Sequence, residues 1–372
     1  MSEYIIRMVG DDLIHKQLND AAFDGENYNF DQMFEGVKDL VQEADIAIIN
    51  QETVLVSDRK KISSFPFFGS PAELADSIVR AGFRAFLHAS NHSLDKGYKG
   101  IEDTLSIWKK YPKTAVLGLH TSAEDARKLK ILRAGDINVA LINLTGPMNY
   151  HPMPFGKPYA VDRMRKKDKK LIRFQIARAK KKADLVIVLP HWGVEYLYEP
   201  ICSQKEWAEF FAECGADMII GTHPHVLQYK EDITTSDGRV VPCMYSLGNF
   251  ISCQVTPGTF LGGMADIRVK DGKIIKADII PLVTHTDSEY SYFTTYPLDK
   301  YTDEMAAENK IFTVIQKQNG GERMNTESIR KLFCDIMERK AMAYAKYKKP
   351  SDVTRSNIKG VFDALLGRNT KD

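Results

Sequence analysis

Cysteine, long apolar runs and an excess of charge of either sign are all scarce in this sequence. The 372 residues include five cysteines, which are widely scattered and never in a Cys-x-x-Cys arrangement. This distribution argues against a disulfide framework and a thiolate zinc site, and it fits a reducing compartment. No uninterrupted apolar run reaches about 18 residues, and the N-terminus has no basic region followed by an apolar stretch of signal length. We therefore predict a cytoplasmic protein with no integral membrane segment.

The balance of charges excludes partners that are recruited by a strong overall field. The chain has 51 Lys and Arg residues against 49 Asp and Glu residues, which gives a formal net charge of +2. Such a chain is not steered as a whole to nucleic acid or to anionic lipid, so any affinity for anions must be local. Its densest basic segment lacks the aromatic interleaving that suggests nucleic-acid binding. We predict no nucleic-acid partner, and the sequence leaves the oligomeric state open.

Short apolar runs alternate with helical patterns over the first 220 residues. The runs are rich in branched side chains, as expected of buried strands. We predict strands over residues 4–9, 46–50, 84–88, 115–117, 137–143, 185–189 and 218–220. Between them, apolar residues at 3.6-residue spacing predict helices over 33–41, 74–79 and 101–108. This alternation is typical of the α/β class, with a mainly parallel sheet covered on both faces.

The pattern changes after residue 239. Strands are predicted over 239–245, 263–270 and 273–281, and an Asp-Gly pair between the last two is a strong hairpin signal. After about residue 301 the spacing becomes helical again. The apolar face of the last predicted helix carries Ile329, Leu332, Phe333, Ile336 and Met337. We predict one domain over residues 1–297 and a C-terminal helical extension over 298–372.

Residues of the types that bind metals stand at the ends of successive predicted strands. They are Asp11, Asn50, Glu52, Asn91, His92, Asp95, His191, Glu195, His223 and His225. In open α/β sheets, ligands bind outside the carboxyl ends of the strands, so these side chains should meet. Each has an alternative role when taken alone, because an aspartate can cap a helix, an asparagine can form a turn, and a buried histidine is usually a hydrogen-bonded core residue. Their density at strand ends favours a shared site.

The ligand types narrow the choice of metal. Carboxylate and amide oxygens mixed with imidazole nitrogens suit Zn, Mn or Fe, whereas an all-oxygen set would suit Mg or Ca. We predict one or two such divalent ions. A pair of ions about 3.5–4 Å apart would stabilise both the attacking and the leaving oxygen, which makes hydrolysis the expected reaction class.

Six motifs occur in order along the chain. They are Gly10-Asp11, Asn50-Gln51-Glu52, Ser90-Asn91-His92-Ser93-Leu94-Asp95-Lys96-Gly97, His191-Trp192-Gly193-Val194-Glu195-Tyr196, Gly221-Thr222-His223-Pro224-His225-Val226-Leu227-Gln228 and Tyr245-Ser246-Leu247-Gly248-Asn249-Phe250. In order and spacing they resemble the CapA/PgsA family of poly-gamma-glutamate capsule biosynthesis proteins, a branch of the calcineurin-like metallophosphatase superfamily. The resemblance covers roughly residues 4–285 and implies a four-layer αββα sandwich in which loops at the strand ends hold metals.

The resemblance also implies roles for individual residues. The implied metal ligands are Asp11, Glu52, Asn91, His191, His223 and His225, with Glu52 in the bridging position. His92 would be the general acid, protonating the leaving oxygen while a metal-activated hydroxide attacks. Asp95 would orient His92, and Glu195 could orient a ligand in the same way. The last motif, residues 245–250, is expected to pack beneath the site.

Two features depart from the family pattern. The superfamily's first motif is usually Asp-x-His, but the residue two positions after Asp11 is Leu13. One familiar ligand is therefore missing, which leaves the number of metal ions open. The capsule proteins usually carry an N-terminal membrane anchor, whereas this sequence begins directly with its first predicted strand.

A basic segment lies between residues 163 and 182. Its eleven basic residues are Arg163, Arg165, Lys166, Lys167, Lys169, Lys170, Arg173, Arg178, Lys180, Lys181 and Lys182. Such a segment can bind a polyanion or a phosphorylated substrate. We favour a plainer interpretation, an amphipathic helix with a solvated basic face. The buried side of this helix is predicted to carry Leu171, Ile172, Phe174, Gln175, Ile176 and Ala179.

Two functions fit these observations. The first is a metal-dependent hydrolase of the CapA type, related to poly-gamma-glutamate capsule biosynthesis, that acts on an anionic small molecule or polymer such as a phosphoester or poly-gamma-glutamate. The alternative is a non-catalytic accessory protein that binds an anionic polymer such as poly-gamma-glutamate on the same scaffold. Hydrolysis that depends on a bound metal would favour the first function, and polymer binding without hydrolysis would favour the second.

Overall fold

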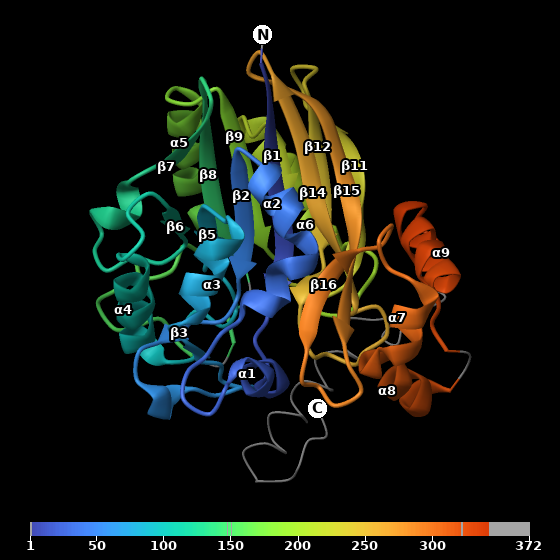
Figure 1. Ribbon diagram of the computed structural model, residues 1–372. Coiled ribbons are helices and arrows are strands. Elements are labelled where there is room, and N and C mark those ends of the chain that lie inside the picture. Colours follow the sequence, from blue (N-terminus) through green and yellow to red (C-terminus); the bar gives the residue numbers. More distant parts are fainter. Residues whose placement is uncertain (1, 147, 150, 321–322, 342–372) are drawn as a thin grey trace.

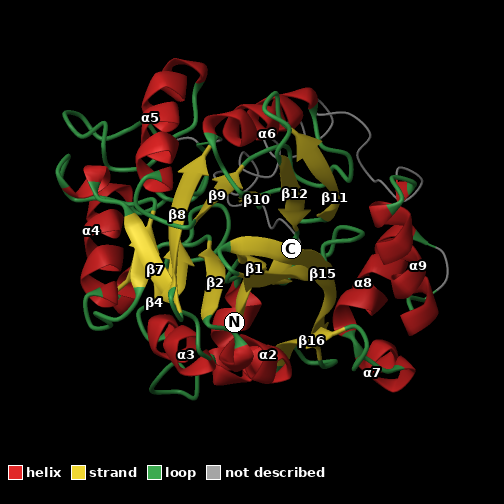
Figure 2. Cartoon of the chain, turned by 90° about the horizontal axis from the view of Figure 1, so that it is seen from above, coloured by secondary structure: helices red, strands yellow, loops and turns green. Residues whose placement is uncertain are grey.

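The protein is a sandwich of two β-sheets with helices on both outer faces (Figure 1). The computed structural model describes residues 2–146, 148–149, 151–320 and 323–341. Viewed from above in Figure 2, helices α5 (Lys169–Lys180) and α6 (Cys202–Cys214) lie on one side of the two sheets. Helices α2 (Lys38–Glu43) and α3 (Leu74–Ala81) lie on the other side. This layering confirms the predicted α/β class and the four-layer αββα sandwich.

The first sheet joins a parallel half to an antiparallel half. Its strand order is β16-β15-β14-β1-β2-β5-β6, with the short β13 alongside β1. Strands β1, β2, β5, β6 and β13 are parallel, and β14, β15 and β16 run antiparallel. The bounds are β1 (Glu3–Asp12), β2 (Ile46–Gln51), β5 (Ala85–Leu87), β6 (Ala115–Leu117), β13 (Asn249–Ile251), β14 (Leu261–Lys270), β15 (Lys273–Thr286) and β16 (Phe293–Pro297). The predicted hairpin between β14 and β15 is present, and its Asp271 and Gly272 both have positive φ, as such two-residue turns require.

The second sheet is parallel in its centre. Its order is β11-β12-β10-β9-β8-β7, and the two edge strands run antiparallel to their neighbours. The bounds are β7 (Lys130–Ala134), β8 (Ile137–Thr145), β9 (Leu185–His191), β10 (Met218–Ile220), β11 (Leu227–Thr234) and β12 (Val240–Leu247). A separate two-stranded ladder pairs β3 (Leu55–Val56) with β4 (Ser70–Pro71). The carboxyl ends of the parallel strands of each sheet therefore lie along one edge, where the candidate residues stand.

Strand residues alternate between two cores. Met8 of β1 belongs to the cluster between the sheets, together with Ile187 of β9, whereas Val9 belongs to the cluster under the outer helices with Ile78 of α3. Burial on both faces explains why the central strands read as continuous apolar runs. Each fully buried side chain of this size stabilises the fold by roughly 1.5–3 kcal/mol, so these runs hold the two sheets in register.

The remaining helical segments of the first half cover the first sheet and its ends. They are α1 (Lys16–Ala22), the 3-10 segment η1 (Asp31–Val37), which continues into α2, η2 (Arg59–Lys61), α4 (Gly97–Trp108) and η3 (Asp125–Arg127). The helix predicted over 33–41 is thus a 3-10 turn followed by an α-helix. Gly36 lies within η1, where a Cβ atom would come 2.4 Å from the Thr295 carbonyl of β16, so this turn presses its backbone against the sheet.

The basic segment is only partly helical. A short turn η4 (Lys166–Asp168) precedes α5, whose buried residues are Ile172, Ile176 and Ala179. Leu171 is 58% exposed and Phe174 is 62% exposed, so their assignment to the buried side was wrong. A single stripe at i, i+4 and i+7 fills the contact with the sheet, and residues one position before or two after its start point away from it.

The C-terminal helices pack at the open side of the sandwich. They are α7 (Asp303–Glu308), α8 (Lys310–Asn319) and α9 (Thr326–Met337), which contact β15 and β11. Ile329, Leu332 and Ile336 are buried in the same cluster that lies between the sheets, and Phe333 and Met337 pack against it half-buried. The division at residue 297 stays a prediction, and residues 342–372 of the predicted extension lie outside the described residues.

None of the helices described for this chain combines the length and the apolar character that crossing a membrane requires.

Candidate metal centre

Close backbone contacts bring the first motif to the second half of the chain. A Cβ atom on Gly10 would lie 1.9 Å from the Gly248 carbonyl oxygen, so only glycine fits there. The Asp11 amide donates a hydrogen bond of 2.9 Å to that oxygen, and Asp11 pairs with Asn249 in the β1–β13 ladder. On its other side Asp11 pairs with Asn50 of β2. The motif predicted to pack beneath the site therefore lies directly beside Asp11.

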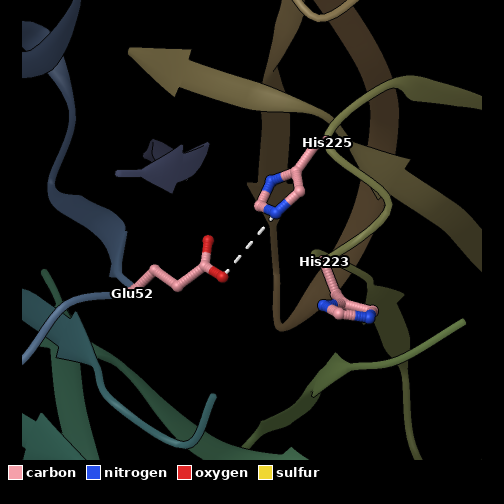
Figure 3. Close-up of side chains that lie close together, drawn as sticks. All are labelled: Glu52, His223 and His225. Atoms are coloured by element: carbon pink, nitrogen blue, oxygen red, sulfur yellow. Dashed lines mark ion pairs between the residues drawn. The ribbon is translucent and has the colours of Figure 1, made fainter. Parts of the chain in front are cut away.

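Glu52, His223 and His225 form the centre of the site (Figure 3). One possible ligand atom from each lies within 4.8 Å of the others, and all three side chains are buried. Glu52 Oε1 is 3.9 Å from His225 Nε2. Both Glu52 oxygens and Nδ1 of His223 are buried without a hydrogen-bond partner among the described residues. Because an unpaired buried carboxylate is costly, this arrangement fits a bound cation.

His191 and Asn91 extend the same cluster from two further strand ends. His191 Nε2 lies 3.7 Å from Glu52 Oε1 and 2.8 Å from the Asn91 side-chain oxygen. Nδ1 of His191 lies 3.1 Å from the Thr222 hydroxyl, so Nε2 is the ring nitrogen that faces Asn91 and Glu52. Three groups that bind metals, a carboxylate, an amide oxygen and an imidazole, thus converge in one place, as the strand ends predicted.

Asp11 lies on the far side of the His225 ring. Its carboxylate accepts hydrogen bonds from the Asn50 side chain at 2.8 Å and from the His223 amide at 3.3 Å, and Oδ2 lies 3.1 Å from His225 Nδ1. The Asn249 side-chain oxygen is 3.0 Å from the same Nδ1, so this nitrogen carries the proton. In this structure Asp11 orients His225, whose Nε2 faces Glu52, and its role as a direct ligand stays a prediction.

The structure brings His92 and Asp95 together at the rim of the centre. His92 Nδ1 lies 2.6 Å from Asp95 Oδ2, which also accepts a 2.7 Å hydrogen bond from the Phe68 amide. His92 Nε2 lies 4.0 Å from Glu52 Oε1 and 3.5 Å from the Asn149 side-chain nitrogen. Asp95 thus holds the ring so that Nε2 faces the cluster, which is the position a proton donor needs.

Serine hydroxyls fix the loop that carries Asn91 and His92. The Ser90 hydroxyl donates to the Glu52 carbonyl at 2.8 Å and accepts from the His92 amide at 3.1 Å. The Ser93 hydroxyl donates to the His88 carbonyl at 2.7 Å. These bonds join the β2 and β5 ends, so the two motifs are positioned as one unit.

The loop that carries the other two histidines holds its backbone in an unfavourable conformation. His223 has φ 97° and His225 has φ 59°, a region that residues with a side chain rarely adopt. Each such residue costs on the order of 1–3 kcal/mol, and such residues cluster at functional sites. The backbone strain therefore favours a functional role for this loop.

Burial sets the protonation of these groups. It lowers the pKa of His191 and of His223 well below the ordinary histidine value, and the neighbouring imidazoles lower both further. Both rings are therefore neutral near pH 7, which is the form that binds metals. Burial also raises the pKa of the Glu52 carboxyl group to about 8, although the charge of His225 acts in the opposite direction.

The pKa of His92 shifts in the opposite direction from the pKa values of His191 and His223. Burial lowers the pKa of His92, but the Asp95 carboxylate and then Glu52 and Glu195 outweigh it and leave the pKa above the ordinary value. A ring that keeps its proton beside the cluster suits a general acid. Glu195 therefore contributes charge to the centre, while its role in orienting a ligand stays a prediction.

Comparison with known proteins places the chain in a family. Residues 5–254 match the family model described as "Bacterial capsule synthesis protein PGA_cap". The chain belongs to this family.

Two curated relatives agree with this assignment and confirm the predicted CapA resemblance. The capsule biosynthesis protein CapA of Bacillus anthracis is 29% identical over 292 residues, which covers 74% of this chain and 66% of that protein. The PGA biosynthesis protein CapA of Bacillus subtilis is 27% identical over 267 residues, which covers 70% and 67% of the two chains. The chain thus spans about two thirds of the length of these relatives.

One solved structure with which the chain aligns is only distantly similar to it. The 5'-nucleotidase of Candida albicans aligns with 91% of this PGA_cap chain and 59% of its own, at 10% identity and a TM-score of 0.41. A likeness at this level supports no inference about activity.

Several residues of the PGA_cap centre were not predicted from the sequence. Thr222 and Asn249 stood inside the quoted motifs, and their contacts with His191 and His225 could have been suspected from that. Asn149 and Phe68 lie outside every motif. Their loops carry no periodic pattern, so no sequence signal placed them beside His92.

Proposed function

We propose that this protein is a metal-dependent hydrolase of the CapA type that acts in the metabolism of an anionic capsule polymer such as poly-gamma-glutamate. The observation that carries the proposal is the Glu52 carboxylate, which is buried, has no hydrogen-bond partner among the described residues, and is faced by the imidazoles of His191 and His225. The names of the two CapA relatives support the link to capsule synthesis.

The residues that would hold the metal are Glu52, His223 and His225, with His191 and Asn91 beside them and Asp11 behind His225. This mixture of nitrogen and oxygen donors suits Zn, Mn or Fe. A divalent ion bound there would polarise a substrate oxygen and lower the pKa of a coordinated water, which supplies the nucleophile for hydrolysis. Leu13, which is buried, offers no ligand, so one or two ions both stay within the proposal.

His92 is the proposed proton donor. Asp95 fixes the ring through Nδ1, so the proton on Nε2 points toward the cluster and is available to the leaving oxygen. Nearly complete burial of His92 and Glu52 excludes bulk water, which strengthens each electrostatic interaction at the site. The cytoplasmic location predicted from the sequence is part of the proposal.

A second candidate function is that of a non-catalytic accessory protein that binds an anionic polymer. Two observations favour it: the missing histidine at Leu13, and the exposed basic side chains of the segment 166–182. In this case the site would hold a structural metal or none.

Metal content and turnover measured in one preparation separate these functions. The protein is purified without chelator, metals are determined by elemental analysis, and hydrolysis of generic phosphomonoesters, phosphodiesters and γ-linked glutamate oligomers is assayed with Mn, Zn and Fe. We expect one or two ions per chain, and His92→Gln should retain them while losing turnover by about 10²–10⁴-fold.

The matched control is His285→Gln, because His285 is buried against Tyr301 in the C-terminal part of the chain. This variant should retain both metal and turnover. Polymer binding by the wild type without hydrolysis of any of these bonds would contradict the hydrolase and leave the accessory protein.

A further inference from the structure

Arg163, the first residue of the basic segment, lies outside the helix and joins the edge of the second sheet. It forms a parallel bridge with Thr145 of β8, and Thr145 is paired with His191 of β9. Residues paired across neighbouring strands point to the same face of a sheet. The Arg163 side chain therefore leaves the sheet on the face from which His191 reaches Glu52. Two strand spacings place the Arg163 and His191 backbones about 10 Å apart.

The neighbours of Arg163 support this direction. Val161, two residues earlier and on the same face, is buried with Leu94 of the loop that carries His92. Asp162, on the opposite face, instead binds His120 at 2.8 Å. The alternation expected of an extended segment thus places Arg163 on the face of the sheet that carries His191.

The Arg163 guanidinium has no counterion in the described part of the chain. Its Nε is buried without a hydrogen-bond partner, and no ion pair to an acidic group forms among these residues. Asp168, the acid whose charge acts on Arg163, is bound by Arg165 through contacts of 2.5 and 2.9 Å. Burial, and then the charge of Arg165, lower the pKa of Arg163, yet a guanidinium stays charged near pH 7.

Arg7 is an example of a buried arginine with a structural role in this protein. Arg7 is almost completely buried, and its guanidinium contacts Asp266 at 2.8 Å and Glu43 at 2.7 Å. Its charge is therefore neutralised within the chain. The charge of Arg163 is left for a group that comes from outside.

We propose that Arg163 binds an anionic group of the substrate, a free carboxylate beside the bond to be cut. This inference rests on the proposed function, because it assigns the substrate class of the same centre. The planar guanidinium matches a carboxylate with two parallel hydrogen bonds. In a γ-linked glutamate polymer each unit keeps a free α-carboxylate close to the amide bond, so a carboxylate necessarily accompanies every bond of the chain.

Equilibrium binding tests the assignment without requiring turnover. A short γ-linked glutamate oligomer is titrated calorimetrically into wild type, Arg163→Gln, Arg163→Lys and Lys167→Gln, since Lys167 is an exposed residue of the same segment. We expect Arg163→Gln to weaken binding about tenfold or more, Arg163→Lys to weaken it less, and Lys167→Gln to change it less than twofold. The same oligomer with its carboxylates converted to carboxamides should bind wild type and Arg163→Gln equally.

Further readouts separate this proposal from a structural role and from the proposed function. Arg163→Gln should leave the thermal midpoint and the metal content unchanged, and where the oligomer is hydrolysed it should raise KM more than it lowers kcat. Wild-type affinity of Arg163→Gln for the oligomer would overturn the assignment even if metal and turnover are present. A tenfold loss of affinity in a protein without metal or turnover would support the assignment and reject the hydrolase. Inorganic phosphate is titrated into the same proteins. If Arg163→Gln loses affinity for phosphate but not for the oligomer, the ligand of Arg163 is not a carboxylate, and a phosphoester substrate is indicated.

Discussion

Two histidine clusters lie at the ends of parallel strands, and they differ in whether their ring nitrogens and carboxylates have hydrogen-bond partners. His120, which follows β6, is buried with Nε2 2.8 Å from Asp162 and Nδ1 3.3 Å from Asp125. Both of its ring nitrogens therefore have a carboxylate partner. In the metal centre, by contrast, both carboxylate oxygens of Glu52 and Nδ1 of His223 have no hydrogen-bond partner among the described residues.

The difference separates structure from ligand binding. Buried polar groups are normally hydrogen-bonded, so a cluster that satisfies itself contributes to stability and needs nothing more. A cluster that leaves a carboxylate and an imidazole unpartnered loses stability until a cation completes it. Histidines and carboxylates at the ends of strands thus do not identify a metal site by themselves. Buried ring nitrogens and carboxylate oxygens without a hydrogen-bond partner are the feature that indicates one.

The largest effect expected from this comparison is on metal content and activity. His223→Ala removes a ligand of the unsatisfied cluster, so the bound metal should fall below detection and turnover should drop about 100-fold or more. His120→Ala removes the centre of the satisfied cluster and should leave metal per chain unchanged. Elemental analysis and the hydrolase assay on the two purified variants check this. Equal loss of metal in both would show that the two clusters do not differ in this way.

The next effect is on the free energy of unfolding. A metal at about 100 times its dissociation constant should stabilise the wild type by about 2.7 kcal/mol, because it binds the folded state alone. Glu52→Gln should lose most of this increment, while in chelator its stability should lie within about 1 kcal/mol of wild type. Asp162→Asn should keep the full stabilisation by metal. Its free energy of unfolding should be lower than that of wild type by about 1–3 kcal/mol, both with metal and in chelator, because the substitution weakens the charge-assisted hydrogen bond to His120. Denaturant unfolding of the three proteins with and without metal measures these free energies, and a metal increment that survives in Glu52→Gln would reject the assigned centre.

The sequence predicted the parts of the site that depend on strand order. Parallel strands share the edge at which they end, so Glu52, Asn91 and His191 could be brought together from their positions alone. The six motifs gave the family resemblance, which implied the four layers, and the alternation of strands and helices gave the α/β class. These features are local, and a single chain displays them.

Contacts made by irregular segments could not be predicted in this way. Asp11 contacts Nδ1 of His225 from a point where the β1–β2 register shifts around Gly10, and such a shift redirects a side chain. Asn149 contacts His92 across 57 residues of the sequence. The pairing of His120 with Asp162 spans 42 residues and leaves no pattern in the sequence. Leu171 and Phe174 show the same limit, because hydrophobicity alone does not say which stripe of a helix meets the sheet.

The smallest effect expected is on the pH dependence of stability. Burial lowers the pKa of His120, but Asp162 and then Asp125 outweigh it, so the folded protein holds the His120 proton above the ordinary pKa of 6.5. The resulting stabilisation is fully present below about pH 6.5 and is lost as the pH rises through the folded pKa. Burial lowers the pKa of His285 instead, so its contribution has the opposite sign. Between pH 6 and 8, the free energy of unfolding should therefore fall less steeply, or rise more steeply, with pH in His120→Gln than in wild type, and the difference should have the opposite sign in His285→Gln. Unfolding curves measured across this pH range check the prediction. If the free energy of unfolding changes with pH in the same way in His120→Gln and wild type, the carboxylates of Asp162 and Asp125 do not raise the pKa of His120.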